Sequence, residues 1–487
     1  MSFLTLKFIA FLIVAISIFY MLPIQYRKTW ILVISYFFYG FNDVRMLWIL
    51  FLITVNVWLF GEIISKGNIS RRKGYYLLGV SINILILCCF KYLTFFIENI
   101  NKLFSIFQLP INLDSPKLLL PLGLSFIVFQ STTYLGDVYY GRIEKVDLLS
   151  VACFVAFFPT RLSGPIQKAR DLLPQLVVMG RWSRQKFIYG LTFLFVGYFE
   201  KIFVADHLAT IIDPVFDSYQ NHNSGTFVYA ALLYSVQIYA DFLAYSDMAS
   251  GIAAMLGISV SKNFANPYMA ESLVEFWKRW HISLNEWFVE YIYIPLGGSK
   301  RGKIRKYLNT FIVFIISGLW HGAQWKFVIW GGLNGLLQII GELLRRPKEI
   351  VVSYIVGTDR SVILSMCRRC VVFIIISMTW VFFRMPNLET ALHALERVSN
   401  QSWLQIFDTN WWNLFGTIQS GVGTIIGIII FFKLQILRRE EEKIVNILCK
   451  EPILIQYCVY TIAWVVILIC ICQRFANPNN MFIYFQF

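Results

Sequence analysis

One of the five histidines in the chain, His321, lies in the middle of an apolar segment, in Ile-Ser-Gly-Leu-Trp-His-Gly-Ala-Gln-Trp. An ionisable side chain at membrane depth is costly, so it indicates a functional site. A neutral imidazole in a low-dielectric tunnel is a suitable general base for an alcohol. Gly318 and Gly322 flank it, so the backbone could bend there and approach a ligand. The alternative is a structural histidine that hydrogen-bonds across helices.

A second histidine, His281, lies in Arg-Trp-His-Ile-Ser-Leu, within a segment rich in aromatic and basic residues. Near the same cavity, its imidazole would orient substrate or stabilise a thioester oxyanion. The alternative is an interfacial side chain with a wet tip. The others, His207, His222 and His393, are expected to be solvated polar residues.

Polar residues in the apolar run around Asp241 and Asp247 could support the first histidine. The two aspartates are six positions apart, so they lie on different helix faces and cannot form a paired-carboxylate site on one face. Their alternative role is hydrogen bonding to neighbouring helices, or to a histidine or arginine from another segment. The set predicted to support His321 is Tyr239, Asp241, Ser246, Asp247, Trp320 and Gln324.

A basic cluster follows Pro295-Leu-Gly-Gly. It would be an electrostatic landing site for an anionic donor, such as the phosphate groups of a coenzyme. The alternative is a topology signal that also attracts anionic lipid. The cluster consists of Lys300, Arg301, Lys303, Arg305 and Lys306.

The chain ends in an apolar aromatic hexapeptide, Phe482-Ile-Tyr-Phe-Gln-Phe. Such a tail normally lies in the aromatic belt of a membrane or packs on the protein. Alternatively, it folds back into the mouth of the cavity. The hydroxyl of Tyr484 would then be able to accept an acyl group.

The composition indicates what kind of molecule must position these residues. Of the 487 residues, 57% are apolar and 15% charged, whereas soluble domains average roughly 45–50% and about 25%. A soluble globular enzyme and a disordered chain are therefore excluded. The nine cysteines show no metal-ligand spacing, because Cys367-Arg-Arg-Cys370 has no second pair, and we expect no metal site.

Runs of roughly 17–25 apolar residues are long enough to span a membrane. Lipid leaves no backbone group unpaired and the runs lack barrel alternation, so only helices fit. The clearest runs are 3–22, 45–64, 75–96, 118–140, 187–203, 227–258, 362–383, 421–437 and 452–472, with the shorter 29–41. With residues 309–343 as a broken helical pair, the sequence predicts an all-α polytopic protein of about 11–12 transmembrane helices.

Lysine and arginine fall in blocks between these runs, so the net charge of +15 is interpreted mostly as an orientation signal. With the blocks on the cytoplasmic side, both termini are extracytoplasmic. No lysine or arginine occurs from Ile202 through Ser261, and residues 206–224, with Asp206, Asp213 and Asp217, are predicted to form an external loop. This pattern argues against a nucleic-acid partner.

Two stretches fit neither a span nor a loop. Residues 151–174 begin apolar and continue as Phe-Pro-Thr-Arg-Leu-Ser-Gly-Pro-Ile-Gln. Residues 263–298 place Trp and Phe at helical spacing, which predicts an amphipathic interfacial helix or a re-entrant piece. Non-helical backbone at membrane depth needs cover from protein or a water-filled cavity. We therefore expect a polar cavity lined by both stretches.

Together these residues resemble the membrane-bound O-acyltransferase (MBOAT) superfamily, and within it the bacterial alginate O-acetylation branch. The most specific pieces are Glu275-Phe-Trp-Lys-Arg-Trp-His-Ile-Ser-Leu, Tyr293-Ile-Pro-Leu-Gly-Gly and Leu319-Trp-His-Gly-Ala-Gln-Trp. Pro121-Leu-Gly-Leu-Ser-Phe, Phe158-Pro-Thr-Arg-Leu-Ser-Gly-Pro-Ile, Phe242-Leu-Ala-Tyr-Ser-Asp-Met-Ala and the terminal hexapeptide also match. The pieces span nearly the whole chain in the family's order.

The resemblance implies one integral membrane domain over residues 1–487, with a core at 118–345 and an extracytoplasmic tail at 474–487. Its helical bundle would surround a central tunnel. The family's essential histidine matches His321, and the second polar position of its motif matches His281. The implied activity is acyl transfer, in this branch from acetyl-CoA as substrate and without a bound cofactor.

The same resemblance implies a bacterial plasma membrane protein that delivers the acyl group to hydroxyls of a cell-surface polysaccharide. Members of the branch usually work with an extracytoplasmic, esterase-like (SGNH-type) transferase. This chain has no Gly-x-Ser-x-Gly motif, which fits a need for such a partner. Membrane lipid and the polysaccharide machinery are the other expected partners.

Three alternatives stay open at this point. The first is D-alanyl transfer onto teichoic acids from a carrier protein, which would dock where the coenzyme phosphates are placed above. The second is a lipid or polysaccharide transporter without covalent chemistry, and the third is a structural scaffold. The second predicts no turnover of a labelled thioester and tolerance of His321 substitution. The third predicts the same lack of turnover but persistent capture of partner proteins. The membrane-depth histidine argues against both.

Overall fold

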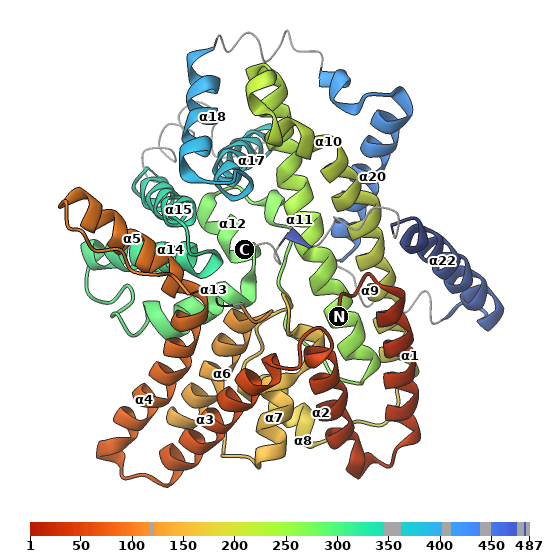
Figure 1. Ribbon diagram of the computed structural model, residues 1–487. Helices are drawn as coiled ribbons and strands as arrows, with labels where there is room; N and C mark the ends of the chain where they lie inside the picture. The colour runs from red at the N-terminus through yellow and green to blue at the C-terminus, as the bar shows by residue number, and fades with distance from the viewer. Residues whose placement is uncertain are drawn as a thin grey trace. The chain divides into compact units, whose positions relative to one another are not determined.

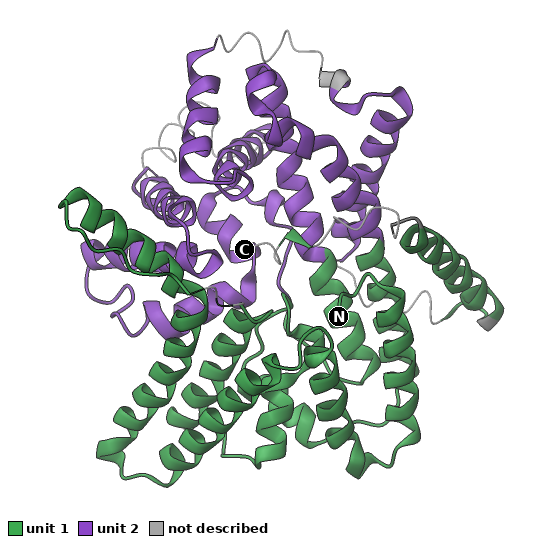
Figure 2. Cartoon of the chain, viewed as in Figure 1, with its two compact units in different colours: residues 1–198, 244–261, 441–486 green, residues 199–243, 262–440, 487 purple. Residues whose placement is uncertain are grey.

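The computed structural model describes residues 1–116, 118, 120–344, 362–401, 411–438, 450–474 and 482–483. Every regular element in this described part is helical, which confirms the all-α prediction. The chain forms two compact units, coloured separately in Figure 2. Unit 1 comprises residues 1–198, 244–261 and 441–486, and unit 2 comprises residues 199–243, 262–440 and 487.

Unit 1 contains the N-terminal helices, part of the long helix α11 (Ser224–Met255) and the last helix (Figure 1). An aromatic cluster lies at its centre, where Tyr245 of α11 stacks on Phe3 with ring centroids 4.7 Å apart. The helices are α1 (Leu6–Met21), α2 (Ile24–Gly40), α3 (Met46–Lys66), α4 (Ile69–Leu87), α5 (Leu93–Ile106), α6 (Leu124–Tyr139), α7 (Leu148–Ala156), α8 (Ala169–Val177), α9 (Arg184–Phe199) and α22 (Ile453–Arg474). The π-helical turn η1 (Cys88–Tyr92) joins α4 to α5, and the short 3₁₀ helix η2 (Phe158–Thr160) follows α7.

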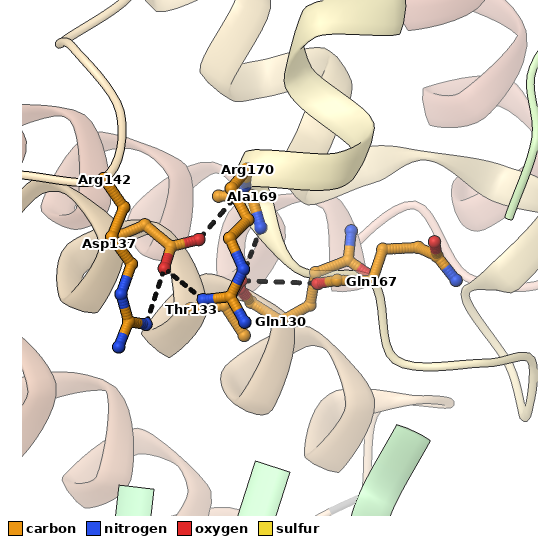
Figure 3. A network of polar contacts seen from close by, with 7 residues as sticks. All are labelled: Gln130, Thr133, Asp137, Arg142, Gln167, Ala169 and Arg170. Carbon is orange, nitrogen blue, oxygen red and sulfur yellow. Dashed lines mark hydrogen bonds and ion pairs between the residues drawn. The ribbon is translucent and has the colours of Figure 1, made fainter. Parts of the chain in front are cut away.

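The irregular stretch between α7 and α8 is buried, and α6 supplies partners for its backbone. Thr133 accepts the amide of Ala169 at 3.1 Å and donates to the carbonyl of Gln167 at 3.3 Å. Asp137, whose side chain is fully buried, accepts the amide of Arg170 and pairs with the guanidinium groups of Arg170 (2.9 Å) and Arg142 (3.1 Å). Figure 3 shows this network. Buried backbone needs partners for its polar groups. These contacts supply them for the Gln167 carbonyl and for the first two amides of α8, which have no partner within that helix.

Unit 2 contains the middle of the chain and most of the residues singled out above. Its helices, besides the first part of α11, are α10 (Asp206–Asp217), α12 (Leu273–Arg279), α13 (Ile282–Phe288), α14 (Lys303–His321), α15 (Trp325–Leu343), α17 (Val362–Arg384), α18 (Leu388–Asn400) and α20 (Ile418–Leu437). Two π-helical turns, η3 (Glu200–Ala205) and η6 (Val289–Tyr293), and the 3₁₀ helices η4 (Tyr219–Asn221), η5 (Pro267–Met269) and η7 (Trp411–Phe415) complete it.

Seven helical stretches among the described residues are long and apolar enough to cross a membrane. They are Met46–Lys66, Ile69–Ile106, Arg184–Asp217, Ser224–Met255, Val362–Arg384, Ile418–Leu437 and Leu454–Cys472. The predicted broken pair over 309–343 is confirmed as α14 and α15, which are interrupted at residues 322–324. The protein is thus a multi-pass membrane protein, while the total of about 11–12 crossings stays a prediction.

The expected external loop over residues 206–224 is wrong for most of its length. Helix α10 occupies Asp206–Asp217 and continues the helical stretch that begins at Arg184. Asp206 is only 8% exposed and pairs with Lys201 at 2.8 Å. His207, expected to be solvated, is only partly exposed and bonds Thr424 at 2.9 Å. Asp206 is thus paired inside the protein, with a partner that the distribution of charges along the sequence does not identify.

Candidate active site

The imidazole of His321 lies at the end of α14, among aromatic rings from three helices of unit 2. The residue is 6% exposed. Its ring centroid is 5.0 Å from that of Trp320, 5.4 Å from that of Trp330 on α15 and 5.1 Å from that of Phe383 on α17. These aromatic rings lower the local dielectric around a group that could accept a proton.

Close packing of α14 against α15 sets this position. A Cβ atom on Gly318 would lie 2.1 Å from the carbonyl oxygen of Phe327, and one on Gly331 would lie 2.3 Å from that of Phe314. Only glycine permits two helices to meet at such distances. Gly322 faces the Phe327 ring, 2.2 Å from where its Cβ would be. Gly318 and Gly322 thus let the backbone approach α15, while the expected approach of a ligand there stays a prediction.

His281 occupies the junction between α12 and α13, with φ at +45° in the left-handed region. The predicted amphipathic helix is therefore two short helices with a sharp turn. Asn263 holds that turn, since its carbonyl accepts the Ile282 amide at 2.8 Å and its side chain accepts the Ser283 hydroxyl at 2.6 Å. A left-handed histidine is uncommon, and such conformations cluster at functional sites.

The two histidines share one aromatic neighbour. The ring of His281 lies 5.9 Å from that of Trp320, which is itself adjacent to His321, and 4.7 Å from that of Phe242. His281 is 3% exposed, and burial lowers its pKa from 6.5 to about 3, which keeps the imidazole neutral near pH 7. The structure thus places the ring of Trp320 beside both histidine rings within unit 2.

The other predicted supporting residues are dispersed. The ring of Tyr239 lies 5.8 Å from that of Trp280, and its hydroxyl donates to the side-chain oxygen of Gln435 at 3.1 Å. Asp241 forms a buried ion pair with Lys201, which matches the alternative of helix-to-helix bonding, although the partner is a lysine. Gln324 is exposed immediately before α15. A role for them beside His321 stays a prediction.

Ser246 and Asp247 are buried, at 4% and 6% exposure, in the part of α11 that belongs to unit 1. Their supporting role also stays a prediction. So does the expectation that residues 151–174 and 263–298 line one cavity, because the first stretch belongs to unit 1 and the second to unit 2.

The basic cluster lies in the turn before α14 and in its first residues. Lys300, Arg301 and Lys303 are exposed. Arg305 donates to the carbonyl of Leu296 at 3.3 Å, and Lys306 pairs with Glu342 of α15. Lys306 is thus already neutralised by a carboxylate, so the exposed cations are the better candidates for binding an anionic donor.

Tyr484 lies outside the described residues. Phe482, from the same hexapeptide, is 1% exposed, and its ring packs edge-on against Tyr245 at 5.3 Å within unit 1. The start of the terminal motif therefore packs on the protein. Neither the position nor the acyl-carrier role of Tyr484 is tested by this contact.

Buried charged groups that the sequence patterns did not single out accompany these residues. Lys201 is 1% exposed and contacts both Asp206 and Asp241. Glu200, fully buried, accepts from Arg438 at 2.8 Å. Lys326, 6% exposed, is the second residue of α15, five positions after His321. The criterion that identifies His321, a charge inside an apolar run, would also identify them. No group of three or more potential metal-ligating side chains occurs in the described ranges.

Known proteins resemble most of this chain. The model of the membrane-bound O-acyltransferase family matches residues 91–383, which include both site histidines. The probable alginate O-acetylase AlgI of Pseudomonas aeruginosa is 34% identical over 421 residues, 85% of this chain and 77% of that protein. The peptidoglycan O-acetyltransferase of Helicobacter pylori is 32% identical over 76% of this chain and 73% of its own length. The teichoic acid D-alanyltransferase of Bacillus subtilis is 27% identical over 44% of this chain and 57% of its own length.

Proposed function

The chain belongs to the membrane-bound O-acyltransferase family, and from this membership we propose that it moves an acetyl group from cytoplasmic acetyl-CoA across the membrane for O-acetylation of a cell-surface polysaccharide. His321 is the proposed general base. The relatives named for O-acetylation of alginate and peptidoglycan support the acyl group and the type of acceptor. The burial of His321 among the rings of Trp320, Trp330 and Phe383 is the observation that carries its assignment.

The proposed reaction begins with the donor at the inner face, where Lys300, Arg301 and Lys303 attract its phosphates. His321 removes the proton of the acceptor hydroxyl, whose oxygen attacks the thioester carbonyl. The C–S bond breaks, the acyl–oxygen bond forms, and the thiol leaves with a proton. Neutral His281 orients the reacting groups through a hydrogen bond. No other energy source is required, because exchange of a thioester for an ester is not steeply uphill.

The acceptor in this proposal is Tyr484 as a temporary carrier, or a serine of an extracytoplasmic esterase-like partner. That partner, with the polysaccharide machinery, then delivers the acetyl group. The proposed location is the bacterial plasma membrane with both termini outside, so the donor and the product lie on opposite faces.

The first test replaces the proposed base. His321→Ala should lower cell-surface acetylation by about 100-fold or more, in line with the contribution of a positioned general base. The measurement is acetate released by mild alkali from the envelope of cells with matched protein levels. His393→Ala is the control, because His393 is exposed on α18 and bonds only Tyr219 among the described residues. Unchanged acetylation in a well-expressed His321→Ala protein would defeat the assignment.

D-alanyl transfer from a carrier protein is the second candidate, and the similarity to a teichoic acid D-alanyltransferase favours it over functions of other classes. The match is weaker in identity and in coverage than those to the O-acetyltransferases. Membranes offered labelled acetyl-CoA and a D-alanyl-charged carrier in competition separate the two. Label in the ester product from acetyl-CoA supports the proposal, and label only from the carrier overturns it.

A further inference from the structure

Lys326 lies on the opposite side of the hairpin bend from His321, in the first turn of α15. Its ammonium group is buried and donates to the carbonyl of Met385 at 2.7 Å and to that of Phe383 at 3.4 Å. It also lies 4.7 Å from the ring centroid of Phe327. A lysine this deeply buried usually has a specific partner, and here the partner is the end of another helix.

Those carbonyls are at the carboxyl end of α17, which closes at Arg384. The last carbonyls of a helix have no partner within the helix, and that end carries partial negative charge. An ammonium group bound there both donates hydrogen bonds to these carbonyls and compensates the partial negative charge. A second cation, Arg384, ties the same end to α10 by pairing with Asp213 (3.0 Å) and Asp217 (2.9 Å). The end of α17 is thus held from two sides.

The residue fixed by this arrangement is Phe383. The centroid of its ring is 5.1 Å from that of the His321 imidazole and 4.6 Å from that of the Trp330 ring, so Phe383 packs directly against the proposed base. Phe327, next to Lys326, packs against the same ring at 5.1 Å. A shift in the end of α17 would therefore move an aromatic ring that packs against the imidazole. Misplacement by about 1 Å can cost an enzyme roughly 100-fold in rate.

We infer that Lys326 is a positioning residue, which holds the end of α17 so that Phe383 keeps His321 oriented for proton transfer. The inference rests on the proposed function, in which His321 is the base. It assigns no contact between Lys326 and substrate. Its content is a chain of two contacts joined through one residue. The ammonium group binds the α17 carbonyls, one of which belongs to Phe383, and the ring of Phe383 packs against the imidazole.

Lys326→Met and Lys326→Arg test this, because methionine keeps an unbranched stem and arginine keeps the charge. In membranes supplied with acetyl-CoA at varied concentration, the methionine variant should lose about 10- to 100-fold in kcat, with KM within about twofold. The arginine variant should recover most of that rate. Lys433→Met, a change at an exposed lysine of α20, serves as the control and should match the wild type.

A double-mutant cycle with Phe383→Leu shows whether the lysine acts through that ring. In the Phe383→Leu background, Lys326→Met should lower kcat by no more than about a further twofold. If the two single losses in kcat multiplied in the double variant, the inference would be overturned. Equal loss in the methionine and arginine variants, or a normal kcat in the methionine variant while His321→Ala is inactive, would also overturn it. Full activity of His321→Ala would instead contradict the proposed function. Thermal unfolding midpoints of all variants separate lost rate from lost folded protein.

Discussion

At the scale of single residues, His281 combines three properties that seldom coincide. It is 3% exposed, its backbone is left-handed, and burial lowers its pKa to about 3. A left-handed conformation costs roughly 1–2 kcal/mol for most residues, and burial of an imidazole adds a further constraint. The left-handed turn presents a neutral imidazole beside Trp320, whose ring is in turn next to that of His321.

The low pKa of His281 has a consequence for acid stability. Below about pH 6.5 the unfolded chain binds a proton at this imidazole, whereas the folded protein does not until about pH 3. Stability is therefore lost as the pH falls through this window and is unaffected above it. His281→Asn, which tolerates the left-handed backbone, should show a smaller drop in thermal midpoint between pH 7.5 and pH 5.0 than the wild type.

Activity should fall in the same His281→Asn protein at pH 7.5 while its fold persists. His393→Asn is the matched control, since His393 is exposed and should leave the pH effect at its wild-type size. If the asparagine variant and the wild type lost equal stability between the two pH values, His281 would not be the buried group that titrates.

At the scale of elements, the hairpin of α14 and α15 determines the site, because it places His321 and Lys326 on either side of one bend. The hairpin depends on backbone contact at Gly318 and Gly331. Glycine in a helix costs up to about 1 kcal/mol relative to alanine, so its presence there is explained by this close approach.

Gly331→Ala and Gly341→Ala form a matched pair on α15. A Cβ at 331 would lie 2.3 Å from a carbonyl oxygen of α14, whereas one at 341 would meet nothing within 4 Å. The first change should destabilise the protein by about 1–3 kcal/mol and lower activity by shifting His321. The second should be neutral or slightly stabilising. Thermal unfolding in detergent together with acetyl transfer measures both, and equal midpoints for the two variants would contradict the close-packing argument.

The buried charged residues of η3 show that the role of a side chain depends on the helices packed around it. Lys201 lies in a π-helical turn and pairs with Asp241 of α11 and Asp206 of α10. π-Helical turns are frequent at functional sites, although here the observed role is to neutralise charge inside a predicted span. Sequence patterns predict an external loop around Asp206 and a supporting role beside His321 for Asp241. Their shared partner is 40 positions from Asp241 along the chain, which no local pattern indicates.

At the scale of the whole molecule, the chain is a multi-pass membrane acyltransferase by its apolar helices and its family. The basic blocks between spans are proposed to orient it, with the donor inside and the aromatic tail outside. The donor and the acceptor must lie on opposite faces of the membrane if an acyl group taken from a cytoplasmic thioester is to reach a surface polysaccharide.

The tail supplies the prediction at this scale. Mass spectrometry of the C-terminal peptide from active cells should detect an acetyl ester on Tyr484, and Tyr484→Phe should lower surface acetylation by about 10-fold or more. The expected loss follows from removing the only hydroxyl of the hexapeptide. Tyr457→Phe on α22, at an exposed tyrosine, is the control. The carrier proposal would be wrong if Tyr484 carried no acetyl group and the Tyr484→Phe variant were fully active.

Class, helical content and family can all be predicted from the amino-acid sequence. The sequence also singles out His321, whose catalytic role stays a prediction. Apolar run length, the cost of charge in lipid and ordered motifs are properties of contiguous residues, so they are readable along the chain. The sequence also identifies His281 but does not predict its left-handed turn, because residues 263–298 have helical periodicity that packing around Asn263 interrupts.

The pairing of distant groups depends on the tertiary structure. Trp320 joins the two histidines, Lys201 neutralises Asp241, and Lys326 holds the end of α17. Each contact joins segments brought together by helix packing, and packing is decided by the shapes of whole faces rather than by local composition. Residue chemistry thus indicates which side chains could react, while their partners, burial and protonation depend on how the helices pack.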